Sequence, residues 1–284
     1  MILVTGATGT NGIEVLKQLA NSGERARGLV RDPLKAQKIL PPEVELARGD
    51  LDDRQSLLAA MEGVEKVFLL CPVSQKQTEL EANVVDAARQ AGVSHLVKFS
   101  VLHASAKSAS QLLRWHAQTE QHIRASGIPF TFLRPNIFMQ EILRQAGSIK
   151  SQGVFYQPFG PDVRLSFVDV RDNAAVAAKV LSESGHEGKV YELTGPAALT
   201  FGEVAEKLSA VAGRKVQYIQ ISVEQWKQAF AGTGAPQWLI DIVAELYSTF
   251  VPANSVVSDG VQRVLGRPAT PFDQFAADCA SELK

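Results

Sequence analysis

The segment TGATGTNG, which runs from Thr5 to Gly12, carries three glycines at intervals of three residues. It follows the short apolar run Met1–Val4, which ends in β-forming residues as a buried parallel strand does. Apolar residues then recur at helical spacing over positions 13–20, and Gly23 is suited to end a helix. The segment therefore predicts a strand, a glycine-rich turn and a helix in direct succession.

Such a turn suits the binding of a phosphate. Glycine has no Cβ, so it allows a positive φ and the close approach of a ligand. Free backbone N–H groups and the positive end of the helix dipole face the same anion in this arrangement. Because the turn lies between a strand and a helix, we expect it to bind a dinucleotide, and a tight turn without a ligand is the alternative. The expected contacts are Gly6, Thr8, Gly9, Thr10, Asn11 and Gly12.

The overall composition is that of an ordinary globular enzyme. The chain has 284 residues, of which 45% are hydrophobic and 21% charged, enough for one large α/β domain or a domain with an added lobe. The net charge of −1 gives no general attraction to nucleic acid or to an anionic membrane. The two cysteines, Cys71 and Cys279, have no metal-ligand spacing and predict no disulfide framework, and we expect no bound metal.

Neither a signal peptide nor a membrane anchor is expected. The first strand-like run starts at Met1, and no apolar run is long enough to span a bilayer. We therefore expect a cytoplasmic protein that acts on a small molecule. The sequence leaves open whether it is a monomer or a homodimer.

The first half of the chain alternates between strand-like and helical patterns. Amphipathic stretches such as Thr78–Ala91 and Leu112–Ser126 lie between six apolar runs. This alternation predicts an α/β fold with a doubly wound parallel sheet, a Rossmann fold, whose ligand crevice follows the carboxyl ends of the strands. The six expected strands are Met1–Val4, Ala26–Val30, Val44–Ala47, Lys66–Leu70, His95–Phe99 and Phe130–Leu133.

After Pro135 the pattern changes. A helical segment over Phe138–Lys150 leads into a stretch rich in glycine and proline, and the strand KVYEL follows at 189–193. Thr200 is expected to cap a helix, and the rest is predicted to be mainly helical with one strand, VQYIQI. We expect residues 1–135 to form the NAD(P)-binding domain. Residues 136–284 are expected to form a smaller, mostly helical substrate lobe, partly interleaved with the sheet.

The residue that follows the second strand indicates which dinucleotide binds. In NAD-binding Rossmann folds an acidic residue about 20 positions after the glycines bonds the ribose 2′-OH. Here Arg31 takes that place, nineteen residues after Gly12, and a guanidinium suits a 2′-phosphate. Lys35 could add a second positive charge, whereas the adjacent Asp32 could reach the ribose instead. We expect NADP(H) over NAD(H), and the alternative is that Arg31 is a solvated arginine at the end of a strand.

The chain lacks the proton donor that many reductases use. Ketone reductases of the short-chain dehydrogenase superfamily carry a Tyr-x-x-x-Lys pair, in which the phenol protonates the carbonyl oxygen. None of the four tyrosines has a lysine four residues later; those positions hold Gly160, Gly195, Ser222 and Val251. In the helix that should carry the pair, His116 takes the place of the tyrosine and Glu120 that of the lysine.

Several motifs together resemble one family. They are TGATGTNG, GLVRDP, ARGDL, HLVKFS, the H-x-x-x-E helix, GIPFTFLRPN and SFVDVRDNAA. Over nearly its whole length the chain resembles the NmrA-like, atypical short-chain dehydrogenase family, above all its bacterial NAD(P)H:quinone reductase and triphenylmethane reductase branch. The resemblance implies that Asp50 and Leu51 border the adenine, although Asp50 could instead cap the next helix. It implies that the nicotinamide lies near Cys71, Pro72, Val73, Ser100, Pro135 and Asn136.

Two side chains near the expected nicotinamide have alternative interpretations. His116 could donate a proton or hold a substrate oxygen, because the pKa of histidine lies near neutrality. Alternatively, it is a histidine on the helix surface, paired with Glu120 one turn away. Cys71 is expected to be a small buried apolar residue rather than a nucleophile.

These observations lead to two hypotheses from different functional classes. The first is an NADPH-dependent reductase that passes hydride directly to a quinone or similar conjugated acceptor, with His116 and Glu120 shaping the pocket. Such an acceptor spreads the developing charge and needs no strong acid from the enzyme. The second is a non-catalytic NADP(H) sensor that binds a partner protein. The short chain, with no added partner-binding segment, favours the reductase.

Overall fold

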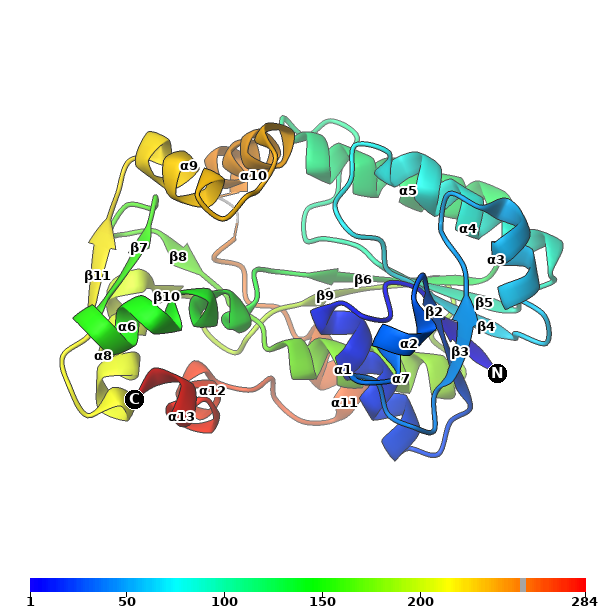
Figure 1. Cartoon of the computed structure of the whole chain (residues 1–284), viewed down its shortest axis with the longest axis horizontal. Coiled ribbons are helices and arrows are strands. Elements are labelled where there is room, and N and C mark those ends of the chain that lie inside the picture. Colours follow the sequence, from blue (N-terminus) through cyan, green and yellow to red (C-terminus); the bar gives the residue numbers. More distant parts are fainter. Residues whose placement is uncertain (251–253) are drawn as a thin grey trace.

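The computed structural model describes residues 1–250 and 254–284, and within them a seven-stranded parallel sheet forms the centre (Figure 1). The strand order is β3-β2-β1-β4-β5-β6-β9, so the order reverses between β1 and β4. The predicted doubly wound α/β fold and its six strands are confirmed. The strands are β1 (Ile2–Val4), β2 (Ala26–Val30), β3 (Glu45–Arg48), β4 (Lys66–Leu69), β5 (His95–Phe99), β6 (Phe130–Pro135) and β9 (Lys189–Leu193).

Helices cover both faces of this sheet. Figure 1 shows α3, α4 and α5 on one face and α1, α7 and α11 on the other. Each face buries its own hydrophobic cluster, as the long apolar strands require. The bounds are α1 (Thr10–Asn21), α2 (Pro33–Ala36), α3 (Arg54–Ala60), α4 (Gln77–Gln90), α5 (Gln111–Ser126), α7 (Val170–Ser182) and α11 (Gly260–Leu265).

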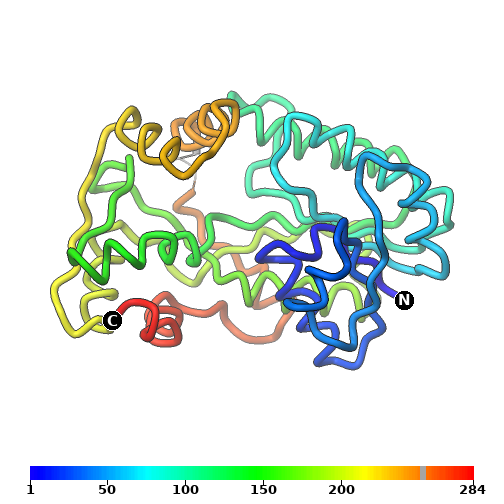
Figure 2. Tube along the Cα trace, in the orientation of Figure 1, coloured from blue at the N-terminus to red at the C-terminus, as the bar shows by residue number. Residues whose placement is uncertain are grey.

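Most of the remaining elements lie beside the sheet, at the left of Figure 2. They build a smaller lobe around a third, aromatic-rich core. Two short sheets, β10-β8 and β11-β7, join it, and only β11 matches a strand expected there. Thr200 caps α8 with a complete capping box, as predicted. The elements are η1 (Met139–Gln145), α6 (Ala146–Gln152), β7 (Val154–Gln157), β8 (Arg164–Leu165), β10 (Leu199–Thr200), α8 (Phe201–Ala212), β11 (Gln217–Gln220), α9 (Val223–Ala231), α10 (Gln237–Phe250), α12 (Phe272–Asp278) and α13 (Ala280–Leu283).

One helix differs from the prediction. The segment expected to be a single helix over Phe138–Lys150 is a 3-10 helix, η1, followed by α6. At the junction, the side-chain amide of Gln145 binds both the backbone N–H and the carbonyl of Tyr156 on β7, each at 2.8 Å. This tertiary contact lies where the 3-10 turns give way to α-helix. The spacing of apolar residues along the sequence does not reveal this contact.

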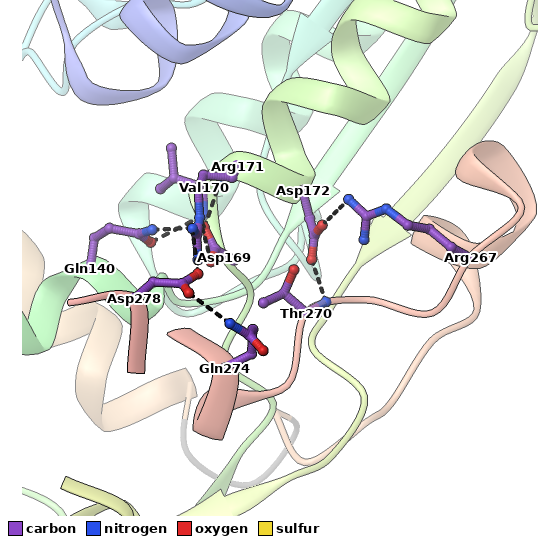
Figure 3. Close-up of polar contacts among 9 residues, drawn as sticks. All are labelled: Gln140, Asp169, Val170, Arg171, Asp172, Arg267, Thr270, Gln274 and Asp278. Atoms are coloured by element: carbon purple, nitrogen blue, oxygen red, sulfur yellow. Dashed lines mark hydrogen bonds and ion pairs between the residues drawn. The ribbon is translucent and has the colours of Figure 1, made fainter. Parts of the chain in front are cut away.

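Two buried carboxylates at the start of α7 tie the lobe to the sheet (Figure 3). Asp169 caps α7 and also binds Arg171, which reaches Asp278 on α12, while Gln140 on η1 donates to Asp169 at 2.8 Å. Asp172 accepts from the Arg267 guanidinium at 2.7 Å and from the backbone N–H of Thr270 at 2.6 Å. The SFVDVRDNAA motif therefore joins η1, α7 and the C-terminal helices.

Over the described ranges, no helix is long and apolar enough to cross a membrane.

Candidate active site

The glycine-rich turn between β1 and α1 contains glycines of two kinds. Gly6 has φ +61°, and a Cβ there would lie 2.8 Å from the Leu70 carbonyl oxygen. A Cβ on Gly12 would overlap the carbonyl of Gly6. A Cβ on Gly9, in contrast, would meet only that same carbonyl oxygen, at 3.4 Å, which is an ordinary contact. Packing within the chain explains Gly6 and Gly12, whereas the surface over Gly9 is open.

The amino end of α1 fits a phosphate group. Gly9 is the residue before the helix, and no side chain of residues 1–250 or 254–284 caps the free N–H groups of the first turn. Thr8 and Thr10 are exposed, and the Oδ1 atom of Asn11 is buried with no hydrogen-bond partner among the described atoms. Free N–H groups at the positive end of the helix dipole attract an anion. The open surface over Gly9 and these unpaired groups fit the pyrophosphate of a dinucleotide.

Three charged residues follow β2, and two of them, Asp32 and Lys35, pair with each other. Arg31 is exposed and makes no ion pair with any other described residue. Asp32 caps α2, accepting from the backbone N–H of Lys35 at 3.2 Å, and this bond is the main cause of its lowered pKa. The Lys35 ammonium lies 3.5 Å from the same carboxylate. Because Asp32 and Lys35 offset each other, Arg31 supplies the uncompensated positive charge at this place.

The expected adenine region lies after β3. The carboxylate of Asp50 accepts from the backbone N–H of Asp52 at 3.2 Å. The alternative, that Asp50 caps the next helix, is wrong, because Asp53 does so through the N–H groups of Gln55 and Ser56. The Leu51 side chain packs against the neighbouring core, and its carbonyl accepts from Asn83 on α4. This loop is therefore held from both sides.

Three neighbouring strands, β4, β5 and β6, carry the residues expected near the nicotinamide. Cys71 is buried after β4, as expected, and burial raises the pKa of its thiol to about 12. Pro72 and Val73 are exposed beside it. Pro135, the last residue of β6, accepts from the backbone N–H of Leu102, and the following Asn136 donates to Ser166 at 2.7 Å.

Glu120 does not pair with His116, so that expectation is wrong. The carboxylate binds the Arg134 guanidinium of β6 in a two-point contact, at 2.9 and 2.5 Å. It also accepts from the Ser100 hydroxyl at 2.7 Å. An arginine fork and a hydroxyl from the adjacent strands thus outcompete a helical neighbour four residues away. Glu120 is buried, and its role in the geometry is to connect β5, β6 and α5.

His116 is half-buried rather than fully exposed on the helix surface. Its Nε2 atom lies 3.4 Å from the Nε2 atom of Gln77, and its Nδ1 atom is buried without a partner among the described atoms. Burial, with a further contribution from the Lys98 charge, holds the pKa of His116 well below its usual value. The ring is therefore neutral at pH 7. A neutral imidazole can donate or accept a hydrogen bond but is a poor acid.

Sequence reasoning missed a buried polar network beneath this histidine. The Lys98 ammonium on β5 lies 2.5 Å from Glu81 on α4, and both side chains are fully buried. The Thr119 hydroxyl on α5 donates to the other oxygen of Glu81 at 2.6 Å. A lysine in the middle of the otherwise apolar run HLVKF was the available signal, because a buried charge requires a partner. Gln77 carried no such signal.

Comparisons with known proteins show which family the chain belongs to. A sequence profile described as the NmrA-like family matches residues 1–274. The chain belongs to the NmrA-like family. It is 43% identical over 277 residues to the NAD(P)H azoreductase of Xenophilus azovorans, covering 97% of this chain and 96% of that protein.

Two solved structures are also similar to this chain. The NADPH-dependent quinone oxidoreductase of Escherichia coli, complexed with NADPH, superposes with a TM-score of 0.86 at 32% identity, covering 100% of this chain and 99% of that one. The triphenylmethane reductase of a Citrobacter species, complexed with NADP(H), gives a TM-score of 0.85 at 31% identity, with 98% and 99% covered. The resemblance inferred from the motifs is thereby confirmed, together with the fold.

Proposed function

We propose that this chain is an NADPH-dependent reductase that passes hydride directly to a quinone, an azo compound or a similar conjugated acceptor. The observation that carries the proposal is the chemistry of the H-x-x-x-E helix. His116 is neutral and Glu120 is held by Arg134, so neither is placed as a strong proton donor. Relatives named for azo, quinone and triphenylmethane reduction support an acceptor of this class.

The proposed cofactor contacts follow from the open groups of the Rossmann domain. NADPH, when bound, supplies the hydride. The surface over Gly9 and the first turn of α1 would hold its pyrophosphate, and Arg31 would bind the 2′-phosphate. We assign the remaining contacts to Asp50, Leu51 and the residues after β4, β5 and β6. A division at residue 135 into cofactor domain and substrate lobe is part of the same proposal.

Direct hydride transfer requires no strong acid among these side chains. A conjugated acceptor spreads the incoming charge over its π-system, and solvent can supply the proton afterwards. The protein then has to orient the acceptor and exclude competing geometries. His116 and Glu120 do so in this proposal as parts of the pocket wall. The network of Ser100, Glu120 and Arg134 suits this role because it leaves the carboxylate no freedom to move.

The proposal extends to location and partners. Both cysteines are free, as a reducing cytoplasm would keep them. The net charge of −1 supports a small molecule rather than a nucleic acid as the partner. Every residue assigned above lies on one chain, so the proposed site is the same in a monomer and in a homodimer.

The direct test is NADPH oxidation, followed at about 340 nm, where the reduced nicotinamide absorbs. Quinones, azo dyes and triarylmethane dyes should be reduced, whereas simple aldehydes and ketones should not. NADH is run in parallel with each acceptor. Tight NADPH binding with no oxidation by any acceptor would contradict the proposal and point to a sensor.

A further inference from the structure

Gln77 is the first residue of α4 and is only 1% exposed, yet half of its amide has no partner in the structure. Its Nε2 atom lies 3.4 Å from Nε2 of His116, while its Oε1 atom is buried and unpaired among the described atoms. The Nδ1 atom of His116 is in the same state. Gln77 is buried and His116 is half-buried, and each of these two touching side chains keeps one buried polar atom without a partner among the described atoms. Such atoms are costly unless a ligand completes them.

The contact between the two side chains determines where the histidine proton resides. With the amide oriented as described, its N–H donates to Nε2, so the proton of the neutral ring sits on Nδ1. The pair then presents one unpaired donor, the Nδ1–H group, and one unpaired acceptor, Gln77 Oε1. With the amide turned over, the donor becomes the amide nitrogen and the acceptor Nδ1. In both orientations the pair offers one donor and one acceptor.

The charged groups around His116 are engaged elsewhere. Lys98 on β5 points its ammonium at Glu81 of α4, which also accepts from Thr119. Glu120, on the same helix as His116, is held by Arg134 of β6. Helix α10 packs against α5, and its Glu245 accepts from the backbone N–H of Gln111. The neutral amide of Gln77 is therefore the side chain left to set the tautomer.

We propose that Gln77 is a positioning residue, which fixes the tautomer of His116 so that the pair hydrogen-bonds the polar atom of the acceptor. That atom would be the carbonyl oxygen of a quinone or a nitrogen of an azo group. It becomes more negative as hydride arrives, and a preorganised N–H donor then binds it more strongly. No proton leaves the ring, and solvent protonates the product later. The identity of the acceptor rests on the proposed function, whereas the tautomer does not.

The tautomer is read by ¹⁵N NMR of the full-length protein labelled at histidine, with the His116 signal assigned by its loss in His116→Phe. In wild type, one nitrogen should be protonated and the pattern should stay constant between about pH 6 and 8, where an ordinary histidine titrates. In Gln77→Glu, the carboxylate should draw the proton to Nε2 and raise the pKa of the ring. Turnover should then depend on pH in this variant only.

Kinetics supply the second readout. Gln77→Met keeps the length of the side chain but cannot hydrogen-bond, so kcat should fall about tenfold while the Kd of NADPH stays constant. The matched control is Gln118→Met, which changes an exposed glutamine on α5 and should alter neither. Far-UV circular dichroism verifies that each variant folds, and Gln77→Asn, which keeps the amide, provides a milder variant.

The outcomes separate the two proposals. An unchanged His116 spectrum in both Gln77→Glu and Gln77→Met would overturn the inference. An equal loss of kcat in Gln118→Met would also overturn it. If the tautomer shifts in the variants but none of the tested acceptors is reduced by NADPH, the role of Gln77 toward His116 stands. The proposed reductase activity is then rejected.

Discussion

The two ends of the expected cofactor site are built in different ways. At the expected phosphate end, the segment between β1 and α1 supplies both a turn and a helix terminus, and the groups available to a ligand are backbone N–H groups. At the acceptor end, side chains from α4, α5, β5 and β6 meet in buried networks. Backbone chemistry needs only a local pattern, whereas side-chain networks need a finished fold. The predictions below test this difference, beginning with the largest effect.

The glycines of the turn should separate folding from binding. Gly12→Val should destabilise the protein by more than about 4 kcal/mol or prevent folding, because its Cβ would overlap the Gly6 carbonyl. Gly9→Val should fold normally and lose NADPH affinity by roughly 100-fold or more, because its side chain would occupy the open surface over the turn. Thermal unfolding and fluorescence titration measure the two effects. Unchanged NADPH affinity in a folded Gly9→Val protein would refute the phosphate cradle.

Removing Glu120 should test whether the acceptor end is a structural network. Glu120→Ala should cost roughly 3 kcal/mol of stability in urea denaturation, because Arg134 and Ser100 would lose their partner. The control is Glu14→Ala, which breaks an exposed helical ion pair with Lys17 and should cost no more than about 0.5 kcal/mol. Similar costs for the two variants would mean that the buried network contributes little.

Arg31 should distinguish the two cofactors at the phosphate end. Charged hydrogen bonds contribute about 1.5–3 kcal/mol, so Arg31→Ala should weaken NADPH binding by about 10- to 150-fold. NADH binding should hardly change. The control is Arg25→Ala, which alters an exposed arginine directly before the first residue of β2. If Arg31→Ala weakens both cofactors equally, the residue supports the structure and does not read the phosphate.

His116 should have the smallest effect on turnover. Loss of a general acid costs a hundredfold or more, whereas His116→Ala should stay within about tenfold. Because the pKa of the ring is lowered, it stays neutral, and wild-type turnover should be flat between about pH 6 and 8. A proton donor would instead lose turnover as the pH rises through about 6.5. His122→Ala on the same helix is the control, and a thousandfold loss in His116→Ala alone would refute direct transfer.

Much of the fold could be predicted because its signals are local. The apolar runs and the glycine-rich turn identified the doubly wound sheet, and six strands were found where expected. Thr200 was recognised as an N-cap because a threonine directly before a helical pattern is a local signal, and the structure adds a capping box with Glu203. The helical segment expected from Phe138 onward consists of two elements, η1 and α6, and the contact of Gln145 with Tyr156 on β7 lies at their junction. Local patterns in the sequence do not reveal such a contact between separate elements.

The same distinction between local sequence patterns and contacts of the folded chain applies at the candidate site. The sequence by itself determined the glycine-rich turn between a strand and a helix, the position of Arg31 and the absence of a Tyr-x-x-x-Lys pair, because these features depend on neighbouring residues and on backbone geometry. Only the tertiary structure decided that Glu120 binds Arg134 and that Gln77 meets His116, 39 residues away. The physical reason is burial, because a buried polar group takes whichever partner the packed elements bring within reach, and spacing along one helix does not reveal it.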